Sequence, residues 1–207
     1  MTAFVLGLSG PMGAGKSTVA ALLRELGAKV LDADAMAKDE QLRGTVGYSA
    51  IVQTFGTKVL GEDKEVDRAK LATEVFGDPA KLLRLERILH PRVIARVLEA
   101  RAMLPDGDVL AIEAIKLIET DLRRLCDAVW IVVAPRSVLV ERLGKRGVGA
   151  GEAELRLARQ SSEAEFRAAA DTVIVNDGDR EKLREQVREA WAALRARAGR
   201  SSRGPGT

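Results

Sequence analysis

The sequence predicts an α/β protein with a parallel five-stranded sheet flanked by helices, a helical substrate-binding insertion and a lid. Three observations lead to this fold class. An apolar segment near the start runs into a glycine-rich loop and then into a helix. Further short apolar segments alternate with amphipathic ones, as in a parallel sheet with helical crossovers. A run of helical segments without strands interrupts this alternation between the second and third strands.

The glycine-rich loop follows a strand predicted over residues 4–9. Residues 10–17 read GPMGAGKS, which matches the pattern G-x-x-x-x-G-K-[ST] of the P-loop. Glycine allows such a loop to turn its backbone N–H groups toward phosphate oxygens without obstruction by a Cβ atom. A helix over 18–26 would direct its positive dipole end at the same phosphates. The sequence therefore predicts a P-loop NTPase-type core; a glycine-rich turn without a ligand is the alternative.

The predicted nucleotide-binding residues belong to this loop and to the end of the last strand. They are Gly10, Met12, Gly13, Ala14, Gly15, Lys16, Ser17, Thr18 and Asn176. Lys16 would reach the β- and γ-phosphates, and the Ser17 hydroxyl would bind the Mg²⁺ that accompanies them. Asn176 lies where kinases of this type hold the adenine edge, although an Asx-turn explains it equally well.

The remaining elements follow in chain order. Further strands are predicted over 28–32, 109–113, 128–134 and 172–176, and further helices over 35–42, 136–143, 152–169 and 180–198. The insertion reads as four helices, over about 46–55, 67–76, 78–89 and 91–104, with a break at His90-Pro91. His90, the only histidine, fits a structural role at such a boundary better than a catalytic one.

The length of 207 residues suits one domain. We expect a single kinase-like domain over 1–198, with a core formed by 1–42 and 106–198, an insertion over about 43–105, a lid over about 144–165 and a disordered tail over 199–207. With aromatic residues at 3% and a net charge of +3, a nucleic-acid partner is not expected. Cys126 is the single cysteine, so an internal disulfide is excluded. Without a signal peptide or a long apolar run, we expect a cytoplasmic protein with no membrane partner.

Two aspartates close the second strand, at the sheet edge where ligands of doubly wound folds bind. Asp34 is the candidate to orient an acceptor hydroxyl and to take its proton. Asp32 is a possible ligand in the water shell of Mg²⁺. The alternative for both carboxylates is that they cap the helix that follows.

Arginines around a glycine-rich stretch suggest the lid. Arg142 and Arg146 are four positions apart, which would place them on one helical face just before Gly147. Arginines on a mobile lid can neutralise the charge of a transferring phosphoryl group and help to exclude water. A solvated charged face with neighbouring glutamates is the alternative.

Taken together, these blocks resemble the dephospho-CoA kinase family over residues 5–190. The similarity rests on the loop at 7–20, on LGAKVLDAD at 26–34, on LERILHP at 85–91, on RLARQ at 156–160 and on VIVN at 173–176. It implies ATP-dependent phosphorylation of the ribose 3′-hydroxyl of dephospho-CoA, with Mg²⁺. The family's proposed base then falls on Asp34, its phosphate-binding lysine on Lys16, and its lid arginines near Arg142 and Arg146.

The chain departs from the family pattern over residues 112–119, IEAIKLIE, where the family usually has an aspartate, a proline and an aromatic residue. Two other functions stay open at this point. One is another small-molecule or nucleoside monophosphate kinase on the same core, and the other is a nucleotide-regulated binding module. The oligomeric state cannot be deduced from the sequence.

Overall fold

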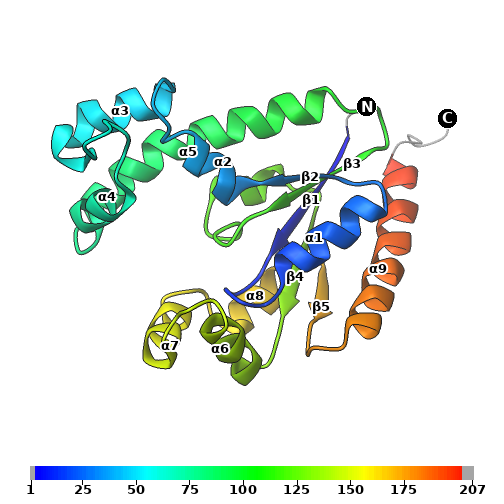
Figure 1. The fold of residues 1–207 in the computed structure, drawn as a ribbon. Helices are drawn as coiled ribbons and strands as arrows, with labels where there is room; N and C mark the ends of the chain where they lie inside the picture. The colour runs from blue at the N-terminus through cyan, green and yellow to red at the C-terminus, as the bar shows by residue number, and fades with distance from the viewer. Residues whose placement is uncertain (1–2, 202–207) are drawn as a thin grey trace. The chain divides into compact units, whose positions relative to one another are not determined.

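A computed structural model describes residues 3–201 of the chain, except for the side chains of 199–201. The chain forms two compact units (Figure 1). The first combines Met1–Leu31 with Ala100–Thr207, and the second is Asp32–Glu99. The last residues of the predicted tail, 202–207, lie outside the described part of the chain.

The predicted five-stranded parallel sheet is confirmed. Its strands are β1 (Phe4–Ser9), β2 (Lys29–Asp32), β3 (Val109–Glu113), β4 (Ala128–Val133) and β5 (Thr172–Val175), in the spatial order β2-β3-β1-β4-β5. β1 is central, paired in parallel with β3 on one side and β4 on the other. The chain leaves β1 toward β2 and β3 and later returns to β4 on the opposite side. The end of β1 is therefore the switch point at which such sheets bind ligands.

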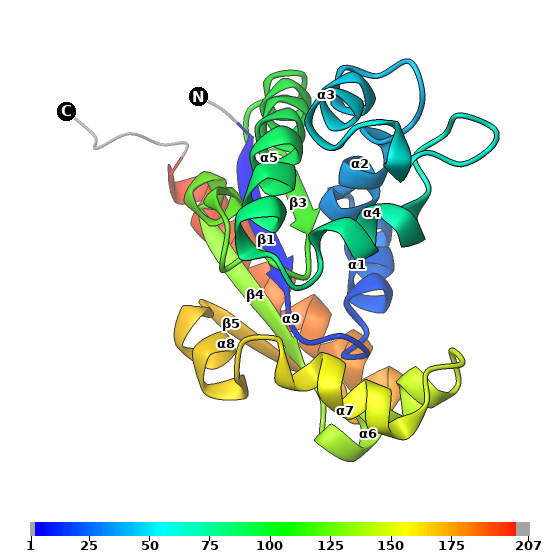
Figure 2. The ribbon, with the colours of Figure 1, turned by 90° about the vertical axis from the view of Figure 1, so that its left-hand side faces the viewer.

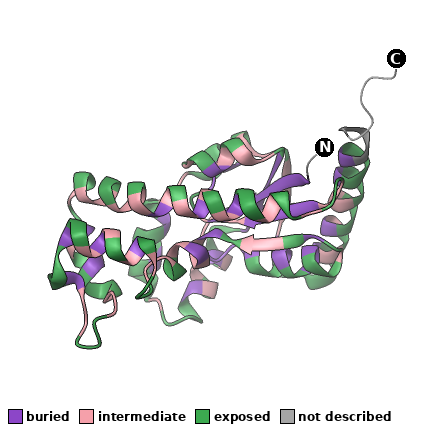
Figure 3. Cartoon of the chain, turned by 90° about the horizontal axis from the view of Figure 1, so that it is seen from above, coloured by how far each residue is buried: buried purple, intermediate pink, exposed green. Residues whose placement is uncertain are grey.

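Helices cover the sheet of the first unit. They are α1 (Lys16–Glu25), α6 (Arg136–Gly144), α7 (Ala150–Ala158), α8 (Glu163–Ala169) and α9 (Arg180–Ser201), with a short 3₁₀ turn at Asp121–Leu125. α1 and α9 lie side by side against one face of the sheet, and α8 packs on β4 (Figures 1 and 2). Along the helices, buried residues recur between exposed ones (Figure 3), as expected for amphipathic elements.

The two faces of β1 are packed differently because successive strand residues point to opposite sides. Leu6 and Leu8 belong to the aliphatic core shared with α1 and α9. A Cβ at Gly7 would lie 2.8 Å from Leu117 Cδ2 and 2.9 Å from Cys126 Sγ. A larger residue at position 7 would therefore require the Leu117 and Cys126 side chains to move.

At the amino-terminal edge of the sheet, two aspartates each bind the N–H group of the second residue of a neighbouring strand. Asp127 precedes β4 and accepts a hydrogen bond from Val5 N at 2.7 Å. Asp171 precedes β5 and accepts one from Val129 N at 2.8 Å. Each carboxylate thus satisfies a backbone donor at a point where the ladder has not yet begun. Arg101 also donates to Asp127, at 3.4 Å.

The second unit is helical. It holds α2 (Ala33–Asp39), α3 (Val46–Phe55), a 3₁₀ turn at Thr57–Val59, α4 (Arg68–Val75) and most of α5 (Pro79–Ala102). Its own apolar core consists of Ile51, Phe55, Val59, Leu71, Val75 and Leu89. Within the described residues, no helix of either unit is long and apolar enough to cross a membrane.

The predicted break at residues 90–91 is wrong, because α5 continues through Pro91 as one helix. Proline in a helix interior removes one backbone hydrogen bond and usually kinks or ends the helix. Here buried residues recur every four positions on both sides of it, at Leu89, Val93 and Val97. Burial of this continuous stripe outweighs the local cost of the proline.

The single helix predicted over 152–169 is also wrong. The chain forms α7 and α8 instead, separated at residues 159–162. Ser162 begins α8 with a capping box, in which its hydroxyl accepts from Glu165 N and the Glu165 carboxylate accepts from Ser162 N. This reciprocal pair satisfies two backbone donors and stabilises a new helix start.

Replacing Asp127 by alanine should lower the free energy of unfolding by about 1–3 kcal/mol, because Val5 N would lose its acceptor inside the sheet. Urea unfolding followed by circular dichroism measures this change. Asp127→Asn retains an acceptor oxygen and should cost clearly less. Equal denaturation midpoints for the alanine variant and the unaltered protein would show that the Val5 bond is not stabilising.

Candidate active site

The glycine-rich loop connects the end of β1 to the start of α1, and its shape depends on glycine at defined positions. Gly13 and Gly15 have φ angles of 84° and 95°, in the left-handed region that other residues rarely adopt. A Cβ at Gly10 would lie 2.1 Å from the carbonyl oxygen of Val132 in β4. The loop therefore packs so tightly against the neighbouring strand that only glycine fits there.

The Lys16 side chain folds back under the loop. Its ammonium donates to the carbonyl oxygens of Gly10 at 2.8 Å and of Pro11 at 3.1 Å. The side chain is almost fully buried, with 7% of its surface exposed. A buried lysine requires nearby acceptors, and these carbonyls supply them. The next residues, Ser17 and Thr18, are exposed at the first turn of α1.

Two further side chains hold the carbonyl groups on the other half of the loop. Arg142 of α6 donates from Nη1 to the oxygens of Gly13 and Ala14, each at 3.3 Å. Asn176, which follows β5, donates from Nδ2 to the same Ala14 oxygen at 2.7 Å. The Asn176 Oδ1 atom accepts from Arg142 Nη2 at 3.1 Å. These contacts form one connected network.

This network also explains the glycine at position 15. A Cβ there would lie 2.2 Å from the Asn176 amide nitrogen. Asn176 is buried, with 6% of its surface exposed, and moving its amide would break the hydrogen bonds to Arg142 and Ala14. The residue predicted from the sequence as an adenine contact thus also braces the loop backbone. Its contact with adenine stays a prediction.

The structure does not support the helical pairing of Arg142 with Arg146. α6 ends at Gly144, and the chain turns through Gly147, whose φ of 82° favours glycine. Val148 N then bonds back to Leu143 O at 3.1 Å, which closes the helix end. Arg146 is exposed in this turn, and among the described residues its guanidinium has no hydrogen-bond or ion-pair partner.

The two predicted aspartates belong to the second unit. Asp32 is the N-cap of α2, and its carboxylate accepts from Ala35 N at 2.8 Å. The cap that was the alternative explanation for Asp32 is therefore present. Asp34 lies in the first turn of α2, where a negative charge interacts favourably with the helix dipole. Their roles toward a metal and an acceptor hydroxyl stay predictions.

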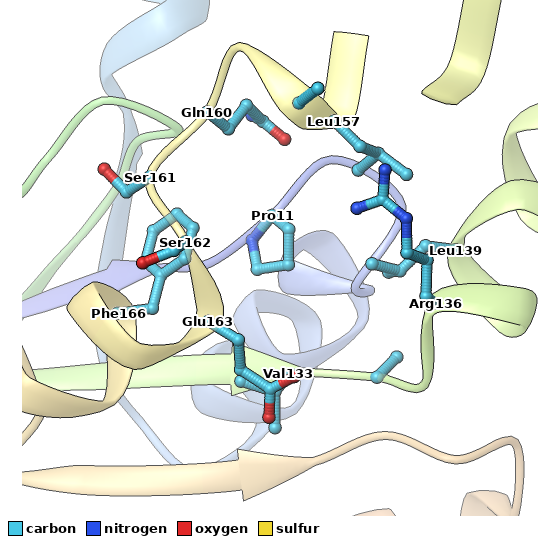
Figure 4. Close-up of a pocket in the computed structure, with 12 residues that line it drawn as sticks. Pro11, Val133, Arg136, Leu139, Leu157, Gln160, Ser161, Ser162, Glu163 and Phe166 are labelled. Carbon is cyan, nitrogen blue, oxygen red and sulfur yellow. The ribbon is translucent and has the colours of Figure 1, made fainter. Parts of the chain in front are cut away.

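The sequence did not assign a role to Gln160, although it belongs to the RLARQ block. Its Oε1 atom accepts a hydrogen bond at 2.9 Å from Met12 N, in the glycine-rich loop, which is called the phosphate loop below. Gln160 also lines a cavity of about 370 Å³ between Pro11, the end of β4, α6 and the junction of α7 with α8 (Figure 4). In the sequence, a polar contact at this position is indicated only by a glutamine two residues before Ser162, which begins α8.

Other chemistry is not favoured by the described residues. None of their histidine, cysteine, aspartate and glutamate side chains form a group of three or more suited to a metal ion. Burial raises the pKa of the Cys126 thiol to about 12, so it stays protonated at neutral pH. Because the thiolate is the reactive form, Cys126 is not a nucleophile here.

Comparison with known proteins decides the family. The family model described as dephospho-CoA kinase matches residues 4–182. The chain belongs to the dephospho-CoA kinase family. A dephospho-CoA kinase from Anaeromyxobacter dehalogenans is 44% identical over 199 residues, which cover 95% of this chain and 94% of the relative. The dephospho-CoA kinase of Thermobifida fusca is 39% identical over 193 residues, covering 93% and 96% of the two chains.

A solved structure has the same fold. The crystal structure of TT1252 from Thermus thermophilus has a TM-score of 0.84 and 32% identity, and the match covers 94% of this chain and 98% of that one. The family match also spans the phosphate loop, Arg142, Gln160 and Asn176. The matched range therefore includes the positions of the loop network described above.

Replacing Asn176 by alanine should weaken ATP binding about three- to tenfold, because the Ala14 carbonyl would lose its shortest donor and the loop its brace. Isothermal titration calorimetry measures the dissociation constant. Asp127→Ala is the matched control, since it removes a partly buried hydrogen bond at the opposite end of the strands. We expect both variants to be less stable, but only Asn176→Ala to bind ATP more weakly. Equal ATP affinity in the two variants would contradict the bracing role.

Proposed function

We propose that this protein is an ATP-dependent dephospho-CoA kinase that phosphorylates the ribose 3′-hydroxyl of dephospho-CoA, giving coenzyme A and ADP. The observation that carries the proposal is the phosphate loop at the switch point of the sheet, with its carbonyls bound by Lys16, Arg142 and Asn176. Family membership over most of the chain selects the substrate among the reactions that this core performs. The acceptor oxygen attacks the γ-phosphorus, the bond from that phosphorus to the β-phosphate oxygen breaks, and ADP leaves.

The loop's own residues would supply most of the charge stabilisation. The backbone N–H groups from Gly13 to Thr18 and the amino end of α1 would bind phosphate oxygens. Lys16 and Arg142 lie beside the loop as two cations and would oppose the negative charge of the transferring group. Arg146 would join them from the turn after α6, within a lid over about 144–165.

Phosphoryl transfer also needs a metal and an oriented nucleophile. The exposed Ser17 hydroxyl at the start of α1 suits a hard cation, so Ser17 would hold Mg²⁺, with Asp32 in its water shell. When bound, Mg²⁺ supplies positive charge to the β- and γ-phosphate oxygens. Asp34 would accept the hydrogen bond of the 3′-hydroxyl and take its proton as the new bond forms.

The direct test is turnover of dephospho-CoA with ATP and Mg²⁺, with the product phosphate located on the ribose by ³¹P NMR. Shikimate and nucleoside monophosphates serve as competing acceptors in the same assay. We expect phosphate on the 3′-oxygen and negligible ADP release with the other acceptors. Preference for a nucleoside monophosphate would overturn the proposed substrate while leaving the kinase reaction in place.

Replacing Lys16 by methionine should lower kcat at least a hundredfold, because the buried site loses the cation aimed at the transferring phosphate. Methionine keeps most of the side-chain volume, but it cannot replace the hydrogen bonds of Lys16 to the Gly10 and Pro11 carbonyls. A coupled ADP-release assay measures the rate, and circular dichroism checks the fold. A kcat within tenfold of the unaltered enzyme would exclude Lys16 as the main phosphate-binding cation.

Asp34→Asn should lower kcat by about 10²–10⁴, the usual contribution of a general base, with little change in ATP affinity. Asp32→Asn is the matched control, since asparagine caps helices as well as aspartate does. If Asp32 acts only as a cap, this variant keeps normal kcat and a normal Mg²⁺ requirement. A raised Mg²⁺ requirement in Asp32→Asn would support the metal role, and near-normal kcat in Asp34→Asn would remove Asp34 from the mechanism.

A further inference from the structure

The hydrogen bond between Gln160 and Met12 runs in the opposite direction to those that Lys16, Arg142 and Asn176 make with the phosphate loop. The side chains of Lys16, Arg142 and Asn176 are donors, and they contact carbonyl groups of the loop. Gln160 is an acceptor, and it contacts a backbone N–H group at 2.9 Å. Residue 11 is proline and has no N–H, so Met12 carries the first N–H group after Gly10. Gln160 therefore binds the loop near its amino-terminal start, at Met12, which is called the leading side of the loop below.

The segment that carries Gln160 is itself held at neighbouring positions. Ser161 Oγ donates to Glu119 Oε1, in the connection after β3, at 2.6 Å. Ser162 forms the capping box that begins α8. Figure 4 shows Gln160, Ser161 and Ser162 following one another along the cavity, opposite Pro11. Three consecutive side chains thus contact three different parts of the first unit.

These contacts limit how the loop can move. Residues 161 and 162 fix the start of α8, and Gln160 extends from this fixed point to Met12. Without the glutamine, the Met12 N–H group, next in the chain to the cavity-lining Pro11, would lose a partly buried partner. A backbone donor without a partner in such a position favours other loop conformations, in which the phosphate-binding shape is no longer preorganised.

We infer that Gln160 is a positioning residue, which holds the leading side of the phosphate loop in its nucleotide-binding conformation from the junction of α7 and α8. It acts through the Met12 backbone, and no contact with the nucleotide is required. The affinity part of this inference rests on the proposed nucleotide-binding function. The conformational part concerns the protein alone and is tested without a nucleotide.

The first experiment measures hydrogen exchange of the Met12 amide by NMR on ¹⁵N-labelled protein without ligand. In Gln160→Met, which removes the acceptor and keeps the length, exchange should be about three- to tenfold faster. Gln160→Glu retains an acceptor oxygen and should restore protection. Ser161→Ala, whose lost contact goes to Glu119, should leave the rate within twofold. Unchanged exchange in Gln160→Met would overturn the inference.

The second experiment measures the dissociation constant for ATP by calorimetry. Gln160→Met should raise it about three- to tenfold. Asp127→Ala is less stable but should bind ATP normally, which separates loop positioning from general destabilisation. Faster Met12 exchange with unchanged ATP affinity would overturn the positioning role. If the unaltered protein bound no ATP, the proposed function would fail, while the exchange result would still stand on its own.

Discussion

The constraint on which this structure depends is the polarity of the phosphate loop backbone. A loop that turns its N–H groups toward a ligand must turn carbonyl groups away from it, and buried carbonyls need donors. Lys16 binds those at the start of the loop, and Arg142 with Asn176 binds those at its centre. These donors come from α1, from α6 and from the end of β5. Segments distant in the sequence therefore converge on one turn.

This arrangement gives single residues more than one task. Arg142 is a cation beside the loop and also a donor to its backbone, so its charge and its bracing role cannot be separated by one substitution. Asn176 connects the guanidinium to Ala14 and fills the space beside Gly15. Gln160 is the acceptor that complements these donors at Met12. Loop shape is thus set from outside the loop as much as by its glycines.

The sequence was sufficient to predict the sheet, the phosphate loop and the family, because strand periodicity and the loop pattern are local signals. It failed where tertiary packing opposes a local rule. Pro91 suggested a break, yet burial of Leu89, Val93 and Val97 keeps α5 continuous. No proline or glycine marks the separation of α7 from α8 in the sequence. Its only sequence signal is Ser162 followed three residues later by Glu165, the spacing of a capping box. The partners of Gln160 and Asn176 depend on chain topology, which periodicity does not contain.

The position of β1 also has a consequence for biosynthesis. Its six residues are all buried, and both of its sheet neighbours are encoded about a hundred residues later or more. At roughly 5–20 residues per second, the ribosome delivers those partners several seconds or more after β1 has been made. The second unit has an apolar core of its own and is complete within that interval. A nascent chain must therefore shield an unpaired apolar strand while its helical insertion folds, and chaperone demand should be greatest in that window.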